Sequence, residues 1–443
     1  QKDARGDVGM PSFICFIHKI ILNRDKENMK TDLLIIGGGV IGVSAAYVLA
    51  KAGANITLLE KGEISSGASY GNAGYIVPCH SNPIPAPGVL TQGLKWLLDA
   101  ESPFYIKPSL SPHLLRWLWQ FQKYCSAESY WRAIPLLRDM QRESLALFKE
   151  WIATEKLDAN FRENGGITIY KDAQAFEAVC EEAEELRNYD IHFDILDTKA
   201  LQALEPLIRD EVVGGISCDT DAYIDPALFT RALAEKAQEH GARILSQTSV
   251  LGFEKSGERI HRVKTTQGDI EVGQVLLAAG AWSTPIVEEI GVDILMQPAK
   301  GYSVTLKNPS ALPGRYLFLG KSKVAVTPLG SSLRYAGTLE LAGYDLSINP
   351  RRLGALRKAG ETYLHKIDGE AAPEIWAGLR PVSPDGLPYI GRSARVKNLV
   401  IATGHAMLGV AMGPFTGQLA ADLLLQHNPS FELSPFKPER FSR

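Results

Sequence analysis

The chain has 443 residues, 45% of them hydrophobic and 22% charged, and this composition excludes a disordered or fibrous protein. Its 47 basic and 50 acidic residues give a formal net charge of −3, which argues against nucleic acid as a partner bound through a general basic field. The five cysteines have no spacing typical of a zinc site, so we expect no metal, no disulfide framework and a reducing compartment.

Residues 1–28 come before the first strong pattern in the sequence. Their apolar run at 13–22 is interrupted by His18 and Lys19, and it lacks the cleavage site of a signal peptide. It is also shorter than the ~18–20 residues that span a bilayer. Because Met29 stands just before the first predicted strand, we expect this stretch to be an extension outside the fold. A genuine N-terminal arm is the alternative.

Residues 30–60 have the pattern of one βαβ unit. A short apolar run at 32–36 is typical of a buried parallel strand, and the Ala-rich stretch at 43–51 is typical of a helix. A second strand is predicted at 55–59, and the acidic Glu60 follows it directly.

Between the first strand and the helix lies the motif Gly37-x-Gly39-x-x-Gly42. Its glycines allow a tight turn, the approach of a pyrophosphate to the backbone, and close packing of helix on strand, while the helix N-terminus favours phosphate. Glu60 lies 21 residues after Gly39, where a carboxylate accepts hydrogen bonds from an adenosine ribose. The pattern therefore predicts an ADP-containing dinucleotide; a Gly-rich turn in an unrelated α/β protein is the alternative.

The rest of the chain alternates between helical and strand-rich stretches. A Gly-, Ser-, Pro- and Asn-rich loop is expected at 62–90, and a Trp- and Leu-rich helical insertion at about 94–151. Further helices are predicted at 173–187, 226–241, 350–366 and 414–426. Further strands are predicted at 165–170, 242–246, 250–254, 260–265, 270–272, 274–279, 300–306, 332–338 and 398–402. This alternation suggests a discontinuous nucleotide-binding domain interleaved with a substrate domain.

Four stretches together resemble the D-amino acid oxidase superfamily of FAD-dependent oxidoreductases. They are the glycine motif with the small-residue loop at 61–74, and the segments 276–283, 378–388 and 402–409. The order of several weaker motifs is similar to that of the bacterial D-amino acid dehydrogenase group. The resemblance runs from about residue 31 to 426, and the departure at Ala406 and Met407 leaves the preferred substrate open.

The resemblance implies an α/β fold, in which a discontinuous Rossmann-like FAD-binding domain is interleaved with an α+β substrate domain on a mostly antiparallel sheet. The expected FAD-binding domain comprises 29–90, 205–295 and 375–443. The expected substrate domain comprises 91–204 and 296–374 and includes the helical insertion.

The resemblance also implies that FAD is bound without a covalent link, by glycine-rich segments and the residues beside them. The expected cofactor-binding residues are Gly37, Gly39, Val40, Ile41, Gly42, Glu60, Lys61, Ser69, Asn72, Ala73, Gly74, Val250, Ala279, Gly280, Trp282, Gly378, Arg380, Gly404, His405, Met407 and Gly409.

The implied chemistry is transfer of a hydride from Cα of an amino acid to flavin N5, followed by hydrolysis of the imine. A planar guanidinium is the best clamp for a carboxylate, so Arg380 is the candidate substrate anchor. His405 is a candidate acid or base, or a residue that orients its loop. Tyr302 and Tyr335 are candidates for a hydroxyl donor or for closing the pocket, or else ordinary strand residues.

We therefore expect a cytoplasmic FAD-dependent enzyme that acts on CH–NH2 or CH–NH groups, with a D-amino acid as substrate and a quinone or oxygen as electron acceptor. Glycine, sarcosine and cis-4-hydroxy-D-proline are alternative substrates, and a flavin-bearing subunit of a larger assembly is an alternative role. The Trp-rich stretch leaves a peripheral contact with the inner membrane open, although plain core packing explains it more simply. The number of subunits stays open.

Overall fold

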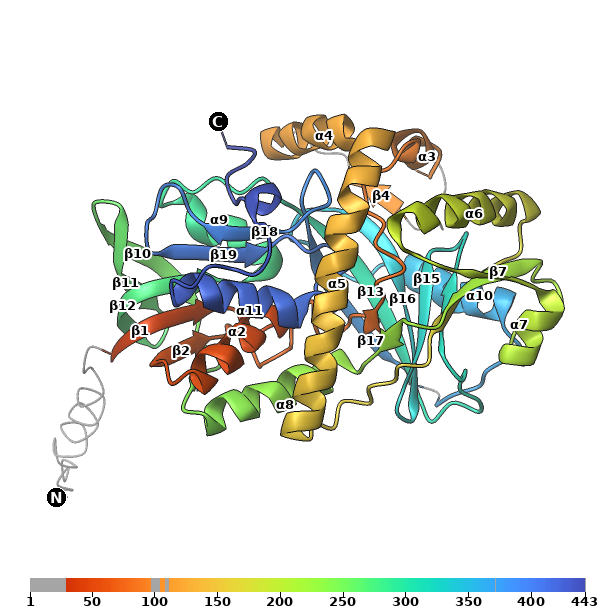
Figure 1. Cartoon of the computed structure of the whole chain (residues 1–443), viewed down its shortest axis with the longest axis horizontal. Coiled ribbons are helices and arrows are strands. Elements are labelled where there is room, and N and C mark those ends of the chain that lie inside the picture. The colour runs from red at the N-terminus through yellow and green to blue at the C-terminus, as the bar shows by residue number, and fades with distance from the viewer. Residues whose placement is uncertain (1–28, 97–103, 108–110, 371, 443) are drawn as a thin grey trace, which may run out of the picture.

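The structure is a computed structural model, and it describes residues 29–96, 104–107, 111–370 and 372–442. Two large sheets stand side by side, one on the left and one on the right of Figure 1. The expected extension at 1–28 lies outside the described residues. In the part of the chain that the structure describes, no helix is long and apolar enough to cross a membrane.

The first sheet is built around parallel strands. Its strand order is β10-β11-β12-β1-β2-β9, with β19 paired to β12 and β18 paired to β19. The bounds are β1 Met29–Ile36, β2 Ile56–Leu59, β9 Arg243–Leu245, β10 Val250–Ser256, β11 Arg259–Thr265, β12 Gly268–Leu277, β18 Tyr389–Arg392 and β19 Leu399–Thr403. Side chains alternate along β1, so Leu33 and Ile35 join one core while Leu34 and Ile36 join another on the opposite face.

Three helices cover one face of this sheet: α2 (Val40–Lys51), α8 (Pro226–Glu239) and α11 (Gly413–Leu424). The sequence predicted two strands at 270–272 and 274–279, but the structure has the single strand β12. Gly273 lies where they join, and a Cβ there would come within 2.6 Å of the Asp32 carbonyl oxygen. Pairing with β1 continues on both sides of this position, from Ile270 to Leu277, so the glycine lets β12 pass close to Asp32 without a break.

The second sheet is mostly antiparallel, as predicted. Its order is β17-β13-β16-β15-β14-β5-β7-β6, with β4 on β16, and the β14–β5 and β16–β4 pairs are parallel. The bounds are β4 Phe104–Ile106, β5 Gly166–Tyr170, β6 Asp194–Asp197, β7 Gly214–Cys218, β13 Gln297–Lys307, β14 Tyr316–Leu319, β15 Val324–Leu329, β16 Ser332–Leu341 and β17 Glu374–Val382. The short strands β3 (Tyr75–Ile76) and β8 (Ala222–Tyr223) pair separately.

The expected domain boundaries need correction at two strands. The division into 205–295 and 375–443 placed β7 and β17 with the dinucleotide-binding domain. Their hydrogen bonds join them instead to β5 and β13 of the second sheet. Strand pairing between distant segments fixes this membership, and the local pattern of each strand does not contain it.

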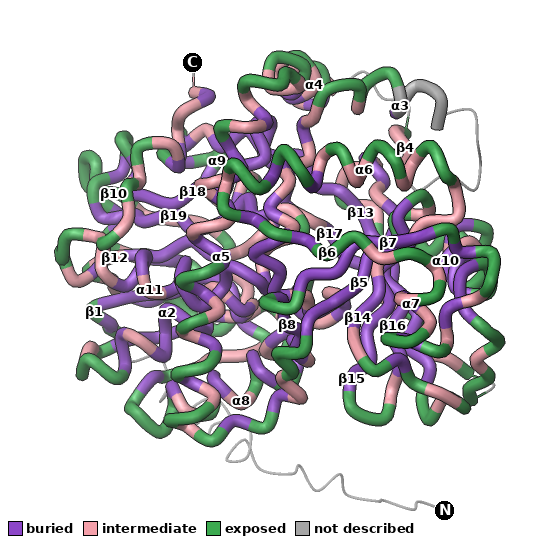
Figure 2. The backbone as a smooth tube through the Cα atoms, turned by 45° about the vertical axis from the view of Figure 1, so that its right-hand side comes forward, coloured by how far each residue is buried: buried purple, intermediate pink, exposed green. Residues whose placement is uncertain are grey.

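The helical insertion resolves into α3 (Val89–Trp96), α4 (Pro112–Tyr124) and α5 (Ala127–Glu155), and α5 runs across the front of the molecule in Figure 1. Phe148 and Trp151 of α5 pack into the core of the first sheet, and Trp117 of α4 is also buried. Trp117 and Trp151 therefore serve as core packing, whereas 57% of Trp119 is exposed. The remaining helices are α6 Ala173–Leu186, α7 Thr198–Leu204, α9 Ser283–Glu288 and α10 Pro350–Tyr363. Figure 2 shows buried backbone along the sheets and exposed residues on the outer helices and loops.

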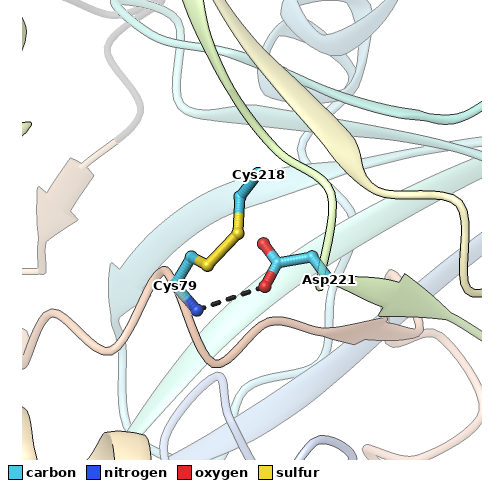
Figure 3. A group of neighbouring side chains, drawn as sticks. All are labelled: Cys79, Cys218 and Asp221. Carbon is cyan, nitrogen blue, oxygen red and sulfur yellow. Dashed lines mark hydrogen bonds between the residues drawn. A yellow bond between two sulfur atoms is a disulfide. The ribbon is translucent and has the colours of Figure 1, made fainter. Parts of the chain in front are cut away.

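Two of the cysteines form a disulfide, against the expectation from their number and spacing. Cys79 lies in the loop after β3, and Cys218 ends β7, 139 residues later in the sequence. Figure 3 shows the bond beside Asp221, whose carboxylate accepts a hydrogen bond from the backbone N–H of Cys79 at 3.1 Å. The fold brings together two cysteines whose spacing carries no signal of pairing. Cys125 and Cys180 are free.

Replacing Cys218 by Ser should lower the free energy of unfolding by about 2–4 kcal/mol, because the disulfide closes a long loop and restricts the unfolded chain. Thermal unfolding followed by circular dichroism, with and without reductant, would measure this. Cys180→Ser is the matched control, since its thiol is unbonded. Equal melting temperatures for Cys218→Ser and the parent would contradict the prediction.

Candidate active site

The turn between β1 and α2 is shaped by glycines that no larger residue could replace. Gly37 has a φ of +117°, and a Cβ there would lie 2.4 Å from the Ala278 carbonyl oxygen. A Cβ on Gly42 would lie 1.9 Å from the carbonyl oxygen of Gly37. Gly39 caps α2 without a side chain, so apart from the Val40 N–H, which donates to Ser69, the end of the helix is left open toward a ligand. This is the geometry that cradles a pyrophosphate at a helix N-terminus.

Glu60 lies beside this turn, as predicted. Its carboxylate accepts hydrogen bonds from the backbone N–H groups of Gly38, at 2.7 Å, and Gly62, at 2.9 Å. These bonds hold an acceptor group at the end of β2, next to the glycine turn. The segment leading to Val250 is nearby, because the N–H of Thr248 donates to the Glu60 carbonyl oxygen at 2.8 Å.

Lys61 and Trp282 meet on the same side of the turn. The Lys61 ammonium lies 3.4 Å from the centre of the Trp282 ring, a cation–π contact. Burial lowers the pKa of Lys61, while the nearby Glu60 partly offsets this effect. Ala279 and Gly280 lead into Trp282 directly after β12, so the segment predicted at 276–283 does reach the dinucleotide turn.

The small-residue loop at 65–74 joins the dinucleotide turn to the second sheet. The Ser69 hydroxyl accepts a hydrogen bond from the N–H of Val40, the first residue of α2, at 3.0 Å. Asn72 accepts from the N–H of Gly74 at 2.8 Å and donates to the carbonyl oxygen of Met407 at 3.3 Å. The Ala73 carbonyl accepts from Thr327 of β15 at 2.8 Å. This loop therefore connects the glycine turn with the predicted segment at 402–409 and with the second sheet.

These residues fit FAD. The glycine turn and the open end of α2, with Val40 and Ile41 in its first turn, suit the pyrophosphate, and Glu60 suits the ribose. The loop that carries Asn72 and Ala73 and the loop that carries Met407 border a cavity large enough for a flavin ring and a small substrate.

This cavity has a volume of about 1240 Å³ and lies between the loop at 68–90, the second sheet and helices α3, α4 and α6. Its wall is largely apolar. Of the residues predicted for the site, the wall contains Asn72, Ala73, Gly378, Arg380 and Met407.

Arg380 has the surroundings expected of a carboxylate anchor. Its guanidinium donates to the carbonyl oxygens of Thr338, at 2.6 Å, and Gly337, at 3.4 Å. Among the described residues, no carboxylate lies within ion-pair distance of it. Burial without a counter-charge lowers the pKa of Arg380 to about 10, so the group stays charged at neutral pH. A buried, unpaired guanidinium facing a cavity is a strong site for an anion.

Gly301 of β13 leaves the space that the guanidinium of Arg380 occupies. β13 lies between β17, which carries Arg380, and β16, whose carbonyl groups receive its hydrogen bonds. A Cβ on Gly301 would lie 2.0 Å from Nη1 of Arg380. The guanidinium can therefore cross the middle strand only because a glycine is there.

Gly301→Ala should reduce kcat/KM by about tenfold to a hundredfold, because the new methyl group displaces the guanidinium while leaving its charge unchanged. Steady-state kinetics and the FAD content of the purified protein would measure this. The matched control is Gly354→Ala in α10, where a Cβ has open space. Unchanged kinetics in Gly301→Ala would show that Arg380 does not need to cross β13.

Thr338 is a site residue that the sequence analysis missed. It is a β-branched residue with a φ of +62°, it is 8% exposed, and it lies in the cavity wall beside Arg380. Such a backbone conformation is strained for threonine, and strain of this kind gathers at functional sites. No sequence motif signals it, because the strain arises from the pairing of β16 with its neighbours.

His405 lies beneath the loop and outside the cavity wall. It is 2% exposed, and its Nε2 forms a hydrogen bond with the Thr416 hydroxyl at 3.0 Å. Burial lowers the pKa of His405 to about 3, so the imidazole is neutral at physiological pH. Of the two roles open from the sequence, the structure favours orienting the loop that begins at Gly404 over acid or base catalysis. Gly404 has a φ of +82°, and Gly409 ends the predicted segment beside His405.

Tyr302 and Tyr335 lie on the opposite face of the second sheet, which corrects the expectation that they close the pocket. Both are buried in the core under α10, and neither lies in the cavity wall. Burial raises the pKa of Tyr335 to about 12. The Tyr302 hydroxyl accepts a hydrogen bond from the N–H of Asn349 at 3.4 Å. These are structural tyrosines, the alternative that the sequence left open.

The sequence analysis also missed a group of polar residues at one end of the cavity. His80 contacts the buried Asp221 through Nδ1, at 3.1 Å, and the Thr168 hydroxyl through Nε2, at 3.1 Å. Glu182 of α6 and Lys323, just before β15, line the same region. These residues come from separate loops and helices, so no spacing in the sequence connects them.

Comparison with known proteins gives a consistent result. Residues 32–423 match the family described as DAO, FAD dependent oxidoreductase. The chain is 32% identical to a D-amino acid dehydrogenase of Xanthobacter autotrophicus over 421 residues, covering 93% of this chain and 99% of the relative. It is 31% identical to a D-amino acid dehydrogenase of Bradyrhizobium diazoefficiens over 427 residues, with the same coverage.

Solved structures show the same fold. The glycine oxidase from Geobacillus kaustophilus has a TM-score of 0.76 at 23% identity, covering 93% of this chain and 99% of that one. The L-proline dehydrogenase from P. horikoshii has a TM-score of 0.70 at 22% identity, covering 94% and 99%. The α/β architecture of the present chain is therefore shared by enzymes with different substrates.

Proposed function

The chain belongs to the DAO family of FAD dependent oxidoreductases, and on this premise we propose that it is a dehydrogenase of D-amino acids. The product would be an imino acid, which water hydrolyses to a 2-oxo acid. Relatives that are about 30% identical over almost their whole length bear the name D-amino acid dehydrogenase, which supports the assignment.

The observation that carries the proposal is the position of Arg380. Its guanidinium faces a cavity bordered by the loops at 68–74 and 406–408, and no described carboxylate is paired with it. An amino acid placed there would leave its carboxylate on the guanidinium and its Cα toward the loops that border the cofactor region. In an enzyme whose cofactor carries the redox chemistry, the main contribution of the protein is to hold the substrate in one orientation.

When bound, FAD supplies the acceptor for the hydride that leaves Cα. Arg380 neutralises and orients the substrate carboxylate, and the carbonyl groups of Gly337 and Thr338 fix the guanidinium. The largely apolar wall excludes water from around the reacting carbon. The N-terminus of α11 follows the loop at 404–409, and its partial positive charge favours negative charge nearby.

Anaerobic mixing of the holoenzyme with a panel of D- and L-amino acids tests the proposal. A D-amino acid should bleach the flavin absorbance, and the 2-oxo acid should appear in equal amount. Bleaching by glycine, sarcosine or cis-4-hydroxy-D-proline alone would move the assignment to another small amine. A flavin that no amine reduces would favour a subunit of a larger assembly. An electron acceptor such as oxygen or a quinone and a peripheral membrane contact stay predictions.

A further inference from the structure

A lysine at the polar end of the cavity has no use in the chemistry described so far. Lys323 lies between β14 and β15, and its side chain is part of the cavity wall. Its φ is +52°, a left-handed conformation in which glycine or asparagine would be the ordinary choice. A long cationic side chain is present here in spite of this backbone cost, which points to a role for the side chain itself.

The Lys323 ammonium has no described carboxylate within ion-pair distance. The acid whose charge acts on it is Glu182, and burial nevertheless lowers the pKa of the lysine. Glu182 is already engaged, because its Oε1 accepts hydrogen bonds from the Tyr130 hydroxyl and from Asn82, the latter at 2.8 Å. The side chain of Lys323 is accessible to solvent although protein surrounds it, because it faces the open space of the cavity.

The cavity therefore contains two cations that have no carboxylate within ion-pair distance among the described residues. In the described wall, the ionised groups are Arg380, Lys323 and Glu182, with the pair of His80 and the buried Asp221 at one side. Glu182 and Asp221 match these two charges in number, but both carboxylates are already held by hydrogen bonds, and neither lies within ion-pair distance of Lys323 or Arg380. A neutral amino acid brings no net charge, whereas one with an acidic side chain brings one negative charge.

The two cations line one cavity from neighbouring parts of the second sheet. The Arg380 guanidinium is held at Gly337 and Thr338 of β16. The Lys323 carbonyl oxygen would lie 3.3 Å from a Cβ on Gly337, so the lysine enters from the neighbouring strand, about 4.8 Å away. The backbone segments that hold the two cations are therefore neighbours in the sheet, and the Lys323 ammonium lies 6.0 Å from the centre of the Phe318 ring in β14. A substrate whose α-carboxylate is on Arg380 would reach Lys323 with a side-chain carboxylate that extends across the cavity.

We propose that Lys323 binds a second anionic group of the substrate, and that the preferred substrates are D-amino acids with an acidic side chain, such as D-glutamate. This inference rests on the proposed function. Arg380 holds the α-carboxylate and Lys323 holds the side-chain carboxylate, with the Thr168 hydroxyl in the same part of the wall. Lys323 is then the residue that determines specificity.

Binding of inert ligands tests the subsite without turnover. Glutarate and butyrate are titrated into the oxidised holoenzyme, and the perturbation of the flavin absorbance gives each Kd. The parent should bind glutarate at least about tenfold more tightly than butyrate, and Lys323→Met should abolish this preference. Lys323→Arg should restore most of it. The control Lys321→Met removes a lysine two residues away that pairs with Asp172 on the surface, and it should keep the preference.

Kinetics with an isosteric pair separate this inference from the proposed function. The kcat/KM of the parent should be about tenfold higher for D-glutamate than for D-glutamine. In Lys323→Met, D-glutamine should become the better of the two substrates. If D-amino acids reduce the flavin but D-glutamine matches D-glutamate, and glutarate binds no better than butyrate, the inference is overturned while the function stands. If no D-amino acid reduces the flavin, the function itself fails.

Discussion

Arg380→Met is expected to lower kcat/KM by about 30-fold to 5000-fold, which corresponds to the loss of about 2–5 kcal/mol for a buried, charge-assisted contact. The substrate carboxylate would then enter an apolar cavity without a counter-charge. The FAD content should be unchanged, because the glycine turn and Glu60 lie away from this residue. Stopped-flow measurement of flavin reduction at several substrate concentrations would separate weaker binding from slower hydride transfer.

Two further variants make this result specific. Arg380→Lys keeps the charge but loses the planar fork that binds a carboxylate through two hydrogen bonds, so it should fall between the parent and Arg380→Met. Arg395→Met removes an exposed arginine and should leave the kinetics unaltered. A loss of FAD in Arg380→Met together with the loss of activity would mean that the residue supports the cofactor site instead of the substrate.

The second large effect is expected for Gly42→Ala, which should weaken FAD binding by on the order of a hundredfold or more, so that the protein purifies largely colourless. A methyl group at this position would lie 1.9 Å from the Gly37 carbonyl oxygen, so the turn and the start of α2 must move apart. The pyrophosphate cradle depends on this close approach. The ratio of flavin to protein absorbance and a titration of the apoprotein with FAD would measure the change.

Gly354→Ala is again the appropriate control, because it adds the same methyl group to a helix where no atom lies within 4 Å. It should retain FAD as the parent does. A Gly42→Ala protein that is fully loaded with FAD would show that the turn can relax without harm to the cradle. Circular dichroism of both variants would show whether a loss of FAD reflects a local change or a failure to fold.

The dinucleotide site was the part of the molecule that could be predicted most fully from the sequence. A buried strand, a glycine turn, a helix and an acidic residue follow one another within about thirty residues, the length of one βαβ unit. The structure places Gly37, Gly42 and Glu60 where that pattern predicts, because each is fixed by neighbours close in sequence or by a short βαβ connection. The later helices with a proline in their first turn were also predicted well for this reason.

Which residues line the substrate side of the cavity depends on the face of the strand that each of them occupies. Along β13, Gly301 lies under the Arg380 guanidinium, so the adjacent Tyr302 points to the opposite face and packs beneath α10. Along β16 the same alternation places Ala336 in the cavity wall and Tyr335 in the core. The sequence shows the alternation but does not show which face is covered by a helix.

The amino-acid sequence by itself therefore determined the family and the glycine turn, and it singled out Arg380 as the candidate anchor, since each is carried by a compact local motif. Only the tertiary structure decided that Tyr302 and Tyr335 are core residues, that Cys79 pairs with Cys218, and that Lys323 shares a cavity with Arg380. The physical reason is that these relations come from strand pairings and packing between segments far apart in the chain, and no local spacing records them.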